Sequence, residues 1–336
     1  MSTFNLFERC TAELVSQLRE LGNESIEDRG TCLLREGIAS DQLFIVIDGE
    51  LGVVTQSARK SSEELSTLTQ GALAGEMSWL EKRPPVATVE VHSRSTLLSI
   101  PRAKLDEKVK NEPGFASQFY RLIAEKLALQ IKEQNTWIHR FNQDIGAIEP
   151  LRKILILFAG LDERDVHRLA NLGQRHRLSP GDILLRDNDP VPSLYIVMAG
   201  EADISVSIAG KDQPVGSSRR GEVLGEMTFL LPEQHKASAS IQARSGLDLL
   251  AIDRLQLTQM LDSDPGLSSR FYRGLACMLS QRSRDQLQSH QLADLSRQAE
   301  TELDQLDLEQ LEGASRAARY FDWLCHQARD RQEFTS

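Results

Sequence analysis

The sequence predicts a mainly β protein with flanking α-helices, in which two tandem jelly-roll barrels are joined by a long helix and followed by a helical tail. Three observations predict this architecture. The sequence contains an internal repeat, each copy of the repeat passes from a helical pattern to a series of short strand patterns, and each copy closes with a second helical pattern.

Length and composition favour two folded domains over one. The chain has 336 residues, which is more than a single hydrophobic core usually serves. Hydrophobic residues make up 40% of the chain and charged residues 26%. These values are ordinary for a globular protein and argue against a disordered or fibrous one.

Four blocks of sequence recur in the same order in the second half of the chain, which predicts duplicated domains. Leu43 to Glu50 recurs as Leu194 to Glu201, Gly75 to Met77 as Gly225 to Met227, Leu98 to Arg102 as Leu250 to Arg254, and Pro113-Gly114 with Phe119 to Arg121 as Pro265-Gly266 with Phe271 to Arg273. The repeat places the first domain at residues 1–145 and the second at residues 146–290, and leaves residues 291–336 as a tail.

Each copy begins with a helical pattern and continues as strands. Apolar residues at helical spacing come first, at Leu14, Leu18 and Leu21 in one copy and at Val166, Leu169 and Leu172 in the other. After Gly30 and Gly181 follow short β-rich runs bounded by turn residues, such as 31–35, 43–47 and 183–186. Many short strands separated by turns predict a jelly roll or barrel.

The helix that closes the first copy is predicted to be long. Its apolar positions recur every three or four residues and continue toward Phe141, before Gly146 and Pro150 mark a boundary. They are Phe119, Leu122, Ile123, Leu127 and Ile131. This stripe is compatible with covering the first barrel and with packing on a partner chain.

The tail is predicted to form two amphipathic helices. One apolar stripe runs from Leu292 to Leu306, Gly313 is the predicted stop, and a second stripe consists of Ala317, Phe321, Leu324 and Ala328. The segment 300–312 is markedly acidic. We expect these helices to pack on the second barrel or on another subunit, with a docking surface for a partner protein as the alternative.

The Gly-Glu-Met blocks are the candidate sites, because each lies between strand patterns and opens a short helix-compatible run. The first copy reads Gly75-Glu76-Met77-Ser78-Trp79-Leu80 and continues to Arg83-Pro84-Pro85-Val86-Ala87-Thr88. The second reads Gly225-Glu226-Met227-Thr228-Phe229-Leu230 and continues to Gln234-His235-Lys236-Ala237-Ser238. Both resemble the phosphate-binding cassette of the cyclic nucleotide-binding domain family, whose barrels are RmlC-like jelly rolls.

The resemblance implies a site for a cyclic nucleotide, cAMP or cGMP. Backbone N–H groups at the start of a short helix hold the phosphate, glycine permits close approach, and the cassette glutamate accepts a hydrogen bond from the ribose 2′-hydroxyl. The implied ligand-binding residues are Gly75, Glu76, Met77, Ser78, Arg83, Ala87 and Thr88 in the first domain, and Gly225, Glu226, Met227, Thr228, His235 and Ser238 in the second. Alternatively, Glu76 and Glu226 cap local N–H groups and brace an empty cassette.

Both copies depart from the family at the arginine that normally pairs with the phosphate. Pro85 takes its place in the first copy, and His235 is predicted to take it in the second. A neutral histidine replaces a permanent cation poorly. Arg83 and Lys236 lie close in sequence and are the candidate substitutes. The first copy keeps more of the pattern and is the favoured ligand site.

Charge and motif content exclude several other classes. The net charge of -10 and the acidic tail oppose contact with nucleic acid, and no segment has the length of apolar sequence that spans a bilayer. The cysteines Cys10, Cys32, Cys277 and Cys325 have no metal-ligand spacing and are expected to be free, buried thiols. The start of the sequence has no secretory pattern, so we expect a cytoplasmic protein.

These observations lead to an expected function. No catalytic constellation stands out, and no cofactor or metal is expected. We expect a regulatory protein that senses a cyclic nucleotide mainly through its first domain and relays it to a protein partner by repacking its helices. The alternative is a ligand-free scaffold, and a transcription regulator related to the catabolite activator is third. The partner would bind the long helices or the acidic tail, a homodimer stays open, and no membrane or nucleic-acid partner is expected.

Overall fold

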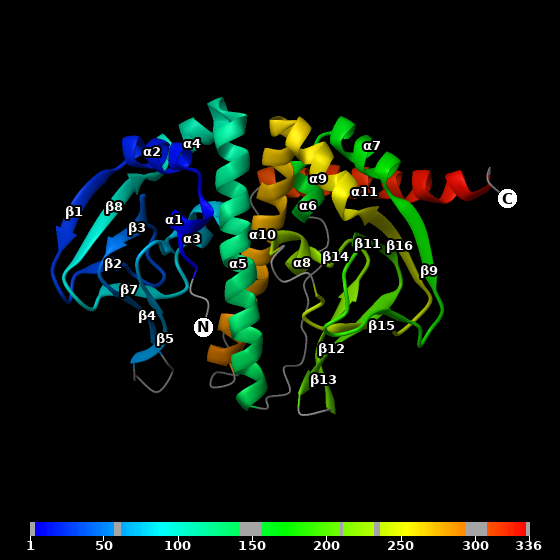
Figure 1. The fold of residues 1–336 in the computed structure, drawn as a ribbon, viewed down its shortest axis with the longest axis horizontal. Coiled ribbons are helices and arrows are strands. Elements are labelled where there is room, and N and C mark those ends of the chain that lie inside the picture. Colours follow the sequence, from blue (N-terminus) through cyan, green and yellow to red (C-terminus); the bar gives the residue numbers. More distant parts are fainter. Residues whose placement is uncertain are drawn as a thin grey trace. The chain divides into compact units, whose positions relative to one another are not determined.

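The computed structural model describes residues 4–56, 62–141, 156–208, 211–231, 236–292 and 308–333 (Figure 1). Contacts divide the chain into two compact units. Unit 1 consists of residues 1–127 and 279–304, and unit 2 of residues 128–278 and 305–336. The two longest helices, α5 (Pro113–Phe141) and α10 (Pro265–Leu292), therefore each contribute residues to both units. Gly146, Pro150, His235 and the predicted tail stripe from Leu295 to Leu306 lie outside the described residues.

Unit 1 is a sandwich of two four-stranded antiparallel sheets, flanked by helices. Its elements are α1 (Leu6–Arg9), α2 (Ala12–Leu21), β1 (Asn23–Glu27), β2 (Cys32–Leu34), β3 (Gln42–Asp48), β4 (Leu51–Gln56), β5 (Ser62–Leu68), β6 (Leu73–Ala74), α3 (Glu76–Glu81), β7 (Thr88–Val91), β8 (Ser95–Pro101) and α4 (Arg102–Asn111). One sheet has the strand order β1-β8-β3-β6 and the other β2-β7-β4-β5. The predicted jelly-roll architecture is confirmed.

Unit 2 repeats the same order of elements. They are α6 (Ile156–Gly160), α7 (Glu163–Leu172), β9 (Gln174–Leu178), β10 (Ile183–Leu185), β11 (Ser193–Ala199), β12 (Glu201–Ile208), β13 (Lys211–Arg219), β14 (Val223–Leu224), α8 (Glu226–Leu230), β15 (Ser240–Ala243), β16 (Leu247–Asp253) and α9 (Arg254–Ser263). The sheets have the orders β14-β11-β16-β9 and β10-β15-β12-β13, which match those of unit 1 strand for strand. The predicted duplication is confirmed.

The turn after the third strand of each barrel requires glycine. Gly49 has a φ of 103°, and a Cβ there would lie 2.2 Å from Oγ of Ser95. Gly200 has a φ of 90°, and a Cβ there would lie 2.2 Å from the carbonyl oxygen of Gly246. Any residue with a Cβ would have an unfavourable backbone conformation here and would also clash with its neighbours. The Gly-Glu pair that follows each hydrophobic strand therefore marks this turn.

The tail differs from the prediction at Gly313. Instead of stopping there, helix α11 runs without interruption over Leu308–Glu333. A glycine inside a helix costs only about 1 kcal/mol relative to alanine, which burial of the apolar stripe in the same helix offsets. Four residues of this stripe, Ala317, Phe321, Leu324 and Ala328, are buried.

Helix α11 packs on α6, α7 and β9. This agrees with the first predicted role of the tail, which is to pack on the second barrel. Phe321 meets the ring of Phe158 edge to face at 5.1 Å, and Trp323 stacks on His167 with ring centroids 3.7 Å apart. Arg220 also lies over the ring of Phe321. This part of the tail is therefore a component of the second unit.

The residue immediately before α10, Asp264, is an acid whose charge is stabilised. Asp264 accepts a hydrogen bond from the Leu267 backbone N–H and pairs with Arg168 at 2.5 Å. The Leu267 hydrogen bond contributes most to holding the pKa of Asp264 below its ordinary value, and Arg168 adds to this effect. A lowered pKa stabilises the fold above the unfolded value of about 4, and this contribution is lost as the pH falls through the folded pKa.

Asp264→Asn is therefore expected to make the second unit less sensitive to acid. Asparagine keeps a side-chain oxygen for the helix cap but cannot be protonated in this range. The loss of unfolding free energy between pH 4.5 and pH 2 should be smaller in the variant, as measured by urea unfolding at each pH. Asp262→Asn, an exposed change in the preceding helix α9, is the control. Equal acid sensitivity in Asp264→Asn and the wild type would contradict the assignment.

None of the helices in the described residues combines the length and the apolar character that a bilayer span requires. Within the same residues, no cluster of His, Cys, Asp and Glu is arranged to hold a metal ion. None of the four cysteines forms a disulfide, but only Cys325 is buried as predicted, since Cys10 and Cys277 are half-buried and Cys32 is exposed. Burial, with the charge of Glu125, raises the pKa of the Cys10 thiol to about 12.

Candidate functional site

The first cassette begins at a glycine with left-handed backbone. Gly75 follows β6 and caps α3 with a φ of 93°. A Cβ at this position would lie 3.2 Å from the carbonyl oxygen of Gln42. Glycine is thus required where the chain turns from the strand into the helix, and the turn places the residues after it, Glu76 and Ser78, in buried positions.

Aromatic side chains hold α3 against the helix that follows the barrel. Trp79 is buried, and its ring stacks on Tyr120 with centroids 5.5 Å apart and meets Phe119 edge to face at 5.7 Å. Its Nε1–H donates to Oδ1 of Asp106 at 2.8 Å. The Phe-Tyr pair belongs to one of the repeated sequence blocks, so the repeat marks a contact between cassette and helix.

Glu76, the predicted ribose-binding residue, pairs with a cation from the same unit. Nζ of Lys126 in α5 donates to its Oε1. Only 4% of the Glu76 side chain and 11% of the Lys126 side chain are exposed, so the pair is largely shielded from water. The interaction joins the cassette to α5 at a site fifty positions away in sequence, which the sequence patterns did not predict.

The end of α3 is bound by a second cation, also within unit 1. Arg284 lies in the part of α10 that belongs to this unit, and its Nε is 2.6 Å from Oε2 of Glu81. The hydroxyl of Ser280 donates to the other carboxylate oxygen. Both Nη atoms of Arg284 donate to the carbonyl oxygen of Pro84 at 3.4 Å. Both carboxylates of the cassette helix are therefore paired with basic side chains of later helices.

The remaining residues of the first cassette form its return to β7. Ser78 Oγ donates to the carbonyl oxygen of Arg83, and Thr88 Oγ1 accepts a hydrogen bond from the Glu36 backbone N–H at 3.1 Å. Ala87 is buried, Arg83 and Met77 are half-buried. The predicted residues from Gly75 to Thr88 are thus assembled in one segment, with Thr88 facing the loop between β2 and β3.

Arg102 is a further cation beside this cassette. Its Nη2 donates to the carbonyl oxygen of Gly75 and its Nε to that of Gln42, both at 3.4 Å. Burial lowers the pKa of this guanidinium, and Asp106 and Asp41 oppose the shift. The repeated sequence block that ends in Arg102 in the first copy and in Arg254 in the second is the sequence signal for this residue. The predicted site does not include it.

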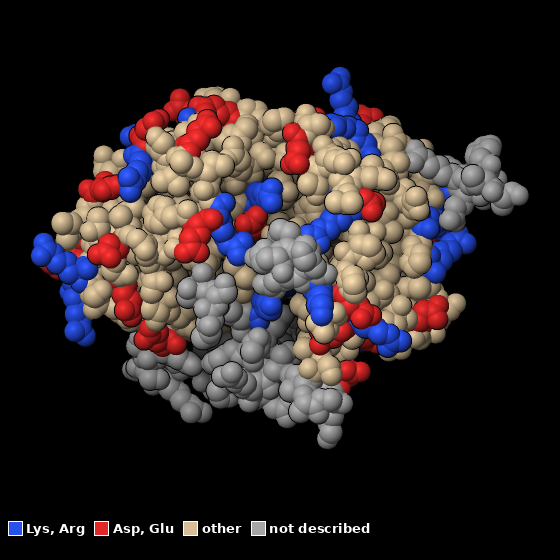
Figure 2. Space-filling model, in the orientation of Figure 1, with Lys and Arg blue, Asp and Glu red and all other residues tan. Residues whose placement is uncertain are grey.

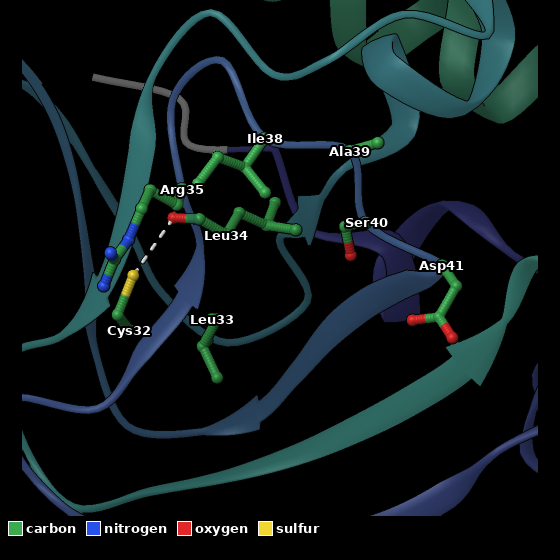
Figure 3. Close-up of a pocket in the computed structure, with 8 residues that line it drawn as sticks. All are labelled: Cys32, Leu33, Leu34, Arg35, Ile38, Ala39, Ser40 and Asp41. Atoms are coloured by element: carbon green, nitrogen blue, oxygen red, sulfur yellow. Dashed lines mark hydrogen bonds between the residues drawn. The ribbon is translucent and has the colours of Figure 1, made fainter.

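A pocket of about 540 Å³ is formed by β2 and the loop between β2 and β3 (Figure 3). It is lined by Cys32, Leu33, Leu34, Arg35, Ile38, Ala39, Ser40 and Asp41. In Figure 3, Cys32 and Arg35 lie on one side of the pocket, where the thiol donates to the carbonyl oxygen of Leu34, and Asp41 lies on the other. The Leu34 side chain approaches to 3.5 Å of the position that a Gly75 Cβ would occupy.

The second cassette repeats the backbone of the first. Gly225 has a φ of 83°, and the residues Glu226 and Thr228 after it are buried. Phe229 replaces the tryptophan and stacks on Tyr272 with centroids 6.3 Å apart. Thr228 Oγ1 donates to the carbonyl oxygen of Lys236 at 3.3 Å. The predicted residues from Gly225 to Thr228 are thus brought together as in the first copy.

The far end of the second cassette is aligned differently from the prediction. The Asp187 backbone N–H donates to Oγ of Ser240, as that of Glu36 does to Thr88, so Ser240 and not Ser238 is the counterpart of Thr88. In the same way, Asn188 N donates to the carbonyl oxygen of Ala237, as Gly37 N does to that of Pro85. Ala237, not His235, therefore corresponds to Pro85. His235 lies outside the described residues.

Comparison with known protein families identifies both barrels. The profile described as "Cyclic nucleotide-binding domain" matches residues 28–112 and 175–264, which together make up just over half of the chain. The chain belongs to the cyclic nucleotide-binding domain family. The two matched segments include both Gly-Glu-Met blocks and the strands on each side of them, so each unit contains one cyclic nucleotide-binding domain.

Two curated relatives are similar to this chain over part of their length. The chain is 24% identical over 250 residues to the cGMP-dependent protein kinase egl-4 of Caenorhabditis briggsae, covering 73% of this chain and 29% of the kinase. It is 20% identical over 233 residues to the cAMP-dependent protein kinase regulatory subunit of Blastocladiella emersonii, covering 69% of this chain and 50% of that subunit. The chain thus spans half or less of the length of these relatives.

Two solved structures are among those found similar to this chain. The regulatory domain of Toxoplasma gondii PKA with cAMP is 19% identical, with 83% of this chain and 92% of that chain covered and a TM-score of 0.32. The regulatory subunit of a cAMP-independent protein kinase A from Trypanosoma cruzi bound to guanosine is 19% identical, with 76% and 80% covered and a TM-score of 0.30.

The resemblance places the family's arginine at Pro85 in the first domain, and the backbone hydrogen bonds make Ala237 the counterpart of Pro85 in the second. Proline and alanine carry no charge, so a phosphate here would need a cation from another position. The surface drawn in Figure 2 shows Lys and Arg intermixed with Asp and Glu over its coloured atoms. Cations from later helices that contact the first cassette include the half-buried Arg102 and Lys126 and the buried Arg284.

Proposed function

We propose that the chain is a non-enzymatic regulatory protein whose first domain binds a cyclic nucleotide, cAMP or cGMP, and passes this event to a protein partner by repacking helices α5 and α10. Membership of the cyclic nucleotide-binding domain family supports the ligand class. The curated relatives, which are a cGMP-dependent kinase and a cAMP-dependent kinase regulatory subunit, support a regulatory role. The partner contact is placed on the long helices or the tail, with a homodimer as one form of it.

The buried pair of Glu76 and Lys126 is the observation that carries this proposal. The family uses the cassette glutamate to accept the ribose 2′-hydroxyl, and here the same carboxylate is joined to α5. A ribose bound at Glu76 competes with Lys126 for one acceptor. Ligand binding therefore changes the contact between α3 and α5, and a helix that follows the barrel is the element that responds.

The electrostatic setting supports the presence of an anion near Gly75. A cyclic phosphate carries one negative charge, and the Arg102 guanidinium lies against the carbonyl oxygen of Gly75, where the cassette begins. In a partly dehydrated site a charge–charge interaction is stronger than in water. Arg102 supplies part of the positive potential that an arginine would provide at the position of the uncharged Pro85.

Titration calorimetry of the purified chain with cAMP and with cGMP tests the proposal. We expect one of them to bind, and Glu76→Gln to weaken the affinity about 10- to 100-fold, because a hydrogen bond to a charged group contributes about 1.5–3 kcal/mol. Glu226→Gln, the matching change in the second domain, is expected to leave this affinity within about twofold. Thermal unfolding of each variant reports whether the change also disturbs the fold.

A ligand-free scaffold is the second candidate function, and two observations favour it. The arginine position is uncharged in both domains, and both carboxylates of α3 are paired with basic side chains. If no heat is observed with either nucleotide, and Glu76→Gln lowers only thermal stability, the sensor proposal fails. The cassettes would then serve as packing elements.

A further inference from the structure

We propose that residues 279–292 of α10, named here the α10 clasp, hold the first cassette closed through Arg284. The clasp ties the segment from Glu81 to Pro84 to the helix end, so that this segment opens only when the helix end is released. The inference rests on the proposed function for its consequence, which is that the clasp opposes ligand binding at the first domain.

Three contacts converge on the short segment that leaves α3. Arg284 pairs with Glu81 at 2.6 Å, Ser280 donates to the same carboxylate, and the Arg284 guanidinium donates twice to the carbonyl oxygen of Pro84. One side chain therefore bridges the last residue of the cassette helix and the residue before Pro85. Pro85 stands at the arginine position of the family, so the clasp grips the part of the cassette where a phosphate would be bound.

Burial makes separation of the Arg284–Glu81 ion pair costly. The side chains of Arg284 and Glu81 are 8% and 3% exposed, and Ser280 and Ser283 on the same helix are buried completely. Two charges so far removed from water are stable there only while they are paired, and separating such a pair leaves an uncompensated buried charge. Release of the helix end must therefore bring both partners back into water together.

Helix α10 also contacts the second cassette through residues that belong to unit 2. Phe271 and Tyr272, in its first half, pack on Phe229 of α8. The second half provides Ser280 and Arg284 to α3 in unit 1.

Bound ligand and the α10 clasp act on the same segment in opposite ways, because the ligand shifts α3 and the clasp holds it in place. In the present arrangement Lys126 occupies Glu76 while Arg284 occupies Glu81, so both ends of α3 are fixed. A ligand that takes Glu76 displaces Lys126 and shifts α3, and this shift works against the clasp. By linkage, loosening the clasp raises ligand affinity, and bound ligand loosens the clasp.

The test is hydrogen exchange of the full chain with and without cAMP or cGMP, on the double variant Glu81→Gln/Arg284→Met. The double change removes both charges, so neither is left buried alone. We expect exchange in the peptides covering 76–88 and 279–292 to rise together, by about tenfold or more, and nucleotide affinity measured by calorimetry to rise about fivefold or more. Arg273→Met, an exposed change on the same helix, is the control and is expected to match the wild type.

The outcomes separate the clasp from the proposed function. If exchange in 76–88 is unchanged in the double variant, the clasp is refuted whatever the nucleotides do. If exchange rises in both peptides but a nucleotide binds the wild type and the variant equally, the opposition to ligand is refuted while the sensor stands. If both peptides rise together and no nucleotide binds either protein, the mechanical clasp is supported and the sensor fails.

Discussion

Replacing Trp79 with alanine is expected to lower the free energy of unfolding of the first unit by about 3–5 kcal/mol, the range found for large aromatic residues in cores. Trp79 is 6% exposed, stacks on Tyr120 and meets Phe119, so alanine leaves a cavity between the cassette helix and α5. It also removes the hydrogen bond to Asp106. Hydrogen exchange of amides in β3 and β8 measures the loss in the unit itself.

Trp79→Phe separates the packing of the ring from its hydrogen bond. Phenylalanine keeps an aromatic ring but cannot donate to Asp106, so the expected loss is about 1–2 kcal/mol. Phe229→Ala is the matched change in the second unit and should raise exchange in β11 and β16 while leaving β3 and β8 as in the wild type. If Trp79→Ala costs less than about 1 kcal/mol, the cassette helix is not anchored by this ring.

The fold could be predicted because the features that determine it are local and occur twice. Gly49 and Gly200 mark turns that only glycine allows, and the hydrophobic strand before each appears as an uninterrupted apolar run. The Gly75 and Gly225 turns are predicted for the same reason. In each case the backbone conformation restricts the residue type strongly enough to be recognised in a single sequence.

The predicted positions at the far end of the second cassette are wrong because they assume the same spacing after Gly225 as after Gly75. The second copy has two more residues than the first between the glycine and the following strand, and a loop accommodates such an insertion easily. Strand pairing does not accommodate an insertion, since a shift of the register by one residue turns every side chain to the other face of the sheet. Counted back from the pairing of β15 with β10, Ser240 and Ala237 take the positions first given to Ser238 and His235.

The partners of the cassette carboxylates could not be predicted from the sequence. Lys126 and Arg284 are single charges in long helical patterns, where a basic residue usually faces water. Only the packing of those helices on α3 brings them to Glu76 and Glu81. The same limit applies to Gly313, where a local stop signal is overridden by burial of the stripe that follows it.

Replacing Asp248 with alanine is expected to destabilise the second unit by about 3–5 kcal/mol, because it removes the carboxylate that pairs with the buried charge of Arg175. The two residues lie on neighbouring strands, β9 and β16, and form two hydrogen bonds of 2.7 and 2.6 Å. Their side chains are only 8% and 14% exposed. The Asp248 carboxylate also lies 3.9 Å from Nε of Arg329, so exchange in α11 should rise together with that in the two strands.

Asp203→Ala, which removes the acid of another Arg–Asp pair in the same unit, is the control for Asp248→Ala. Its partner is Arg244, and both side chains are at least two-fifths exposed, so the expected loss is below about 1 kcal/mol. The double variant Arg175→Met/Asp248→Leu removes both buried charges and is expected to recover most of the stability, since apolar residues of similar volume replace such pairs well. A single Asp248→Ala variant as stable as Asp203→Ala would show that water reaches Arg175 and that burial does not control this pair.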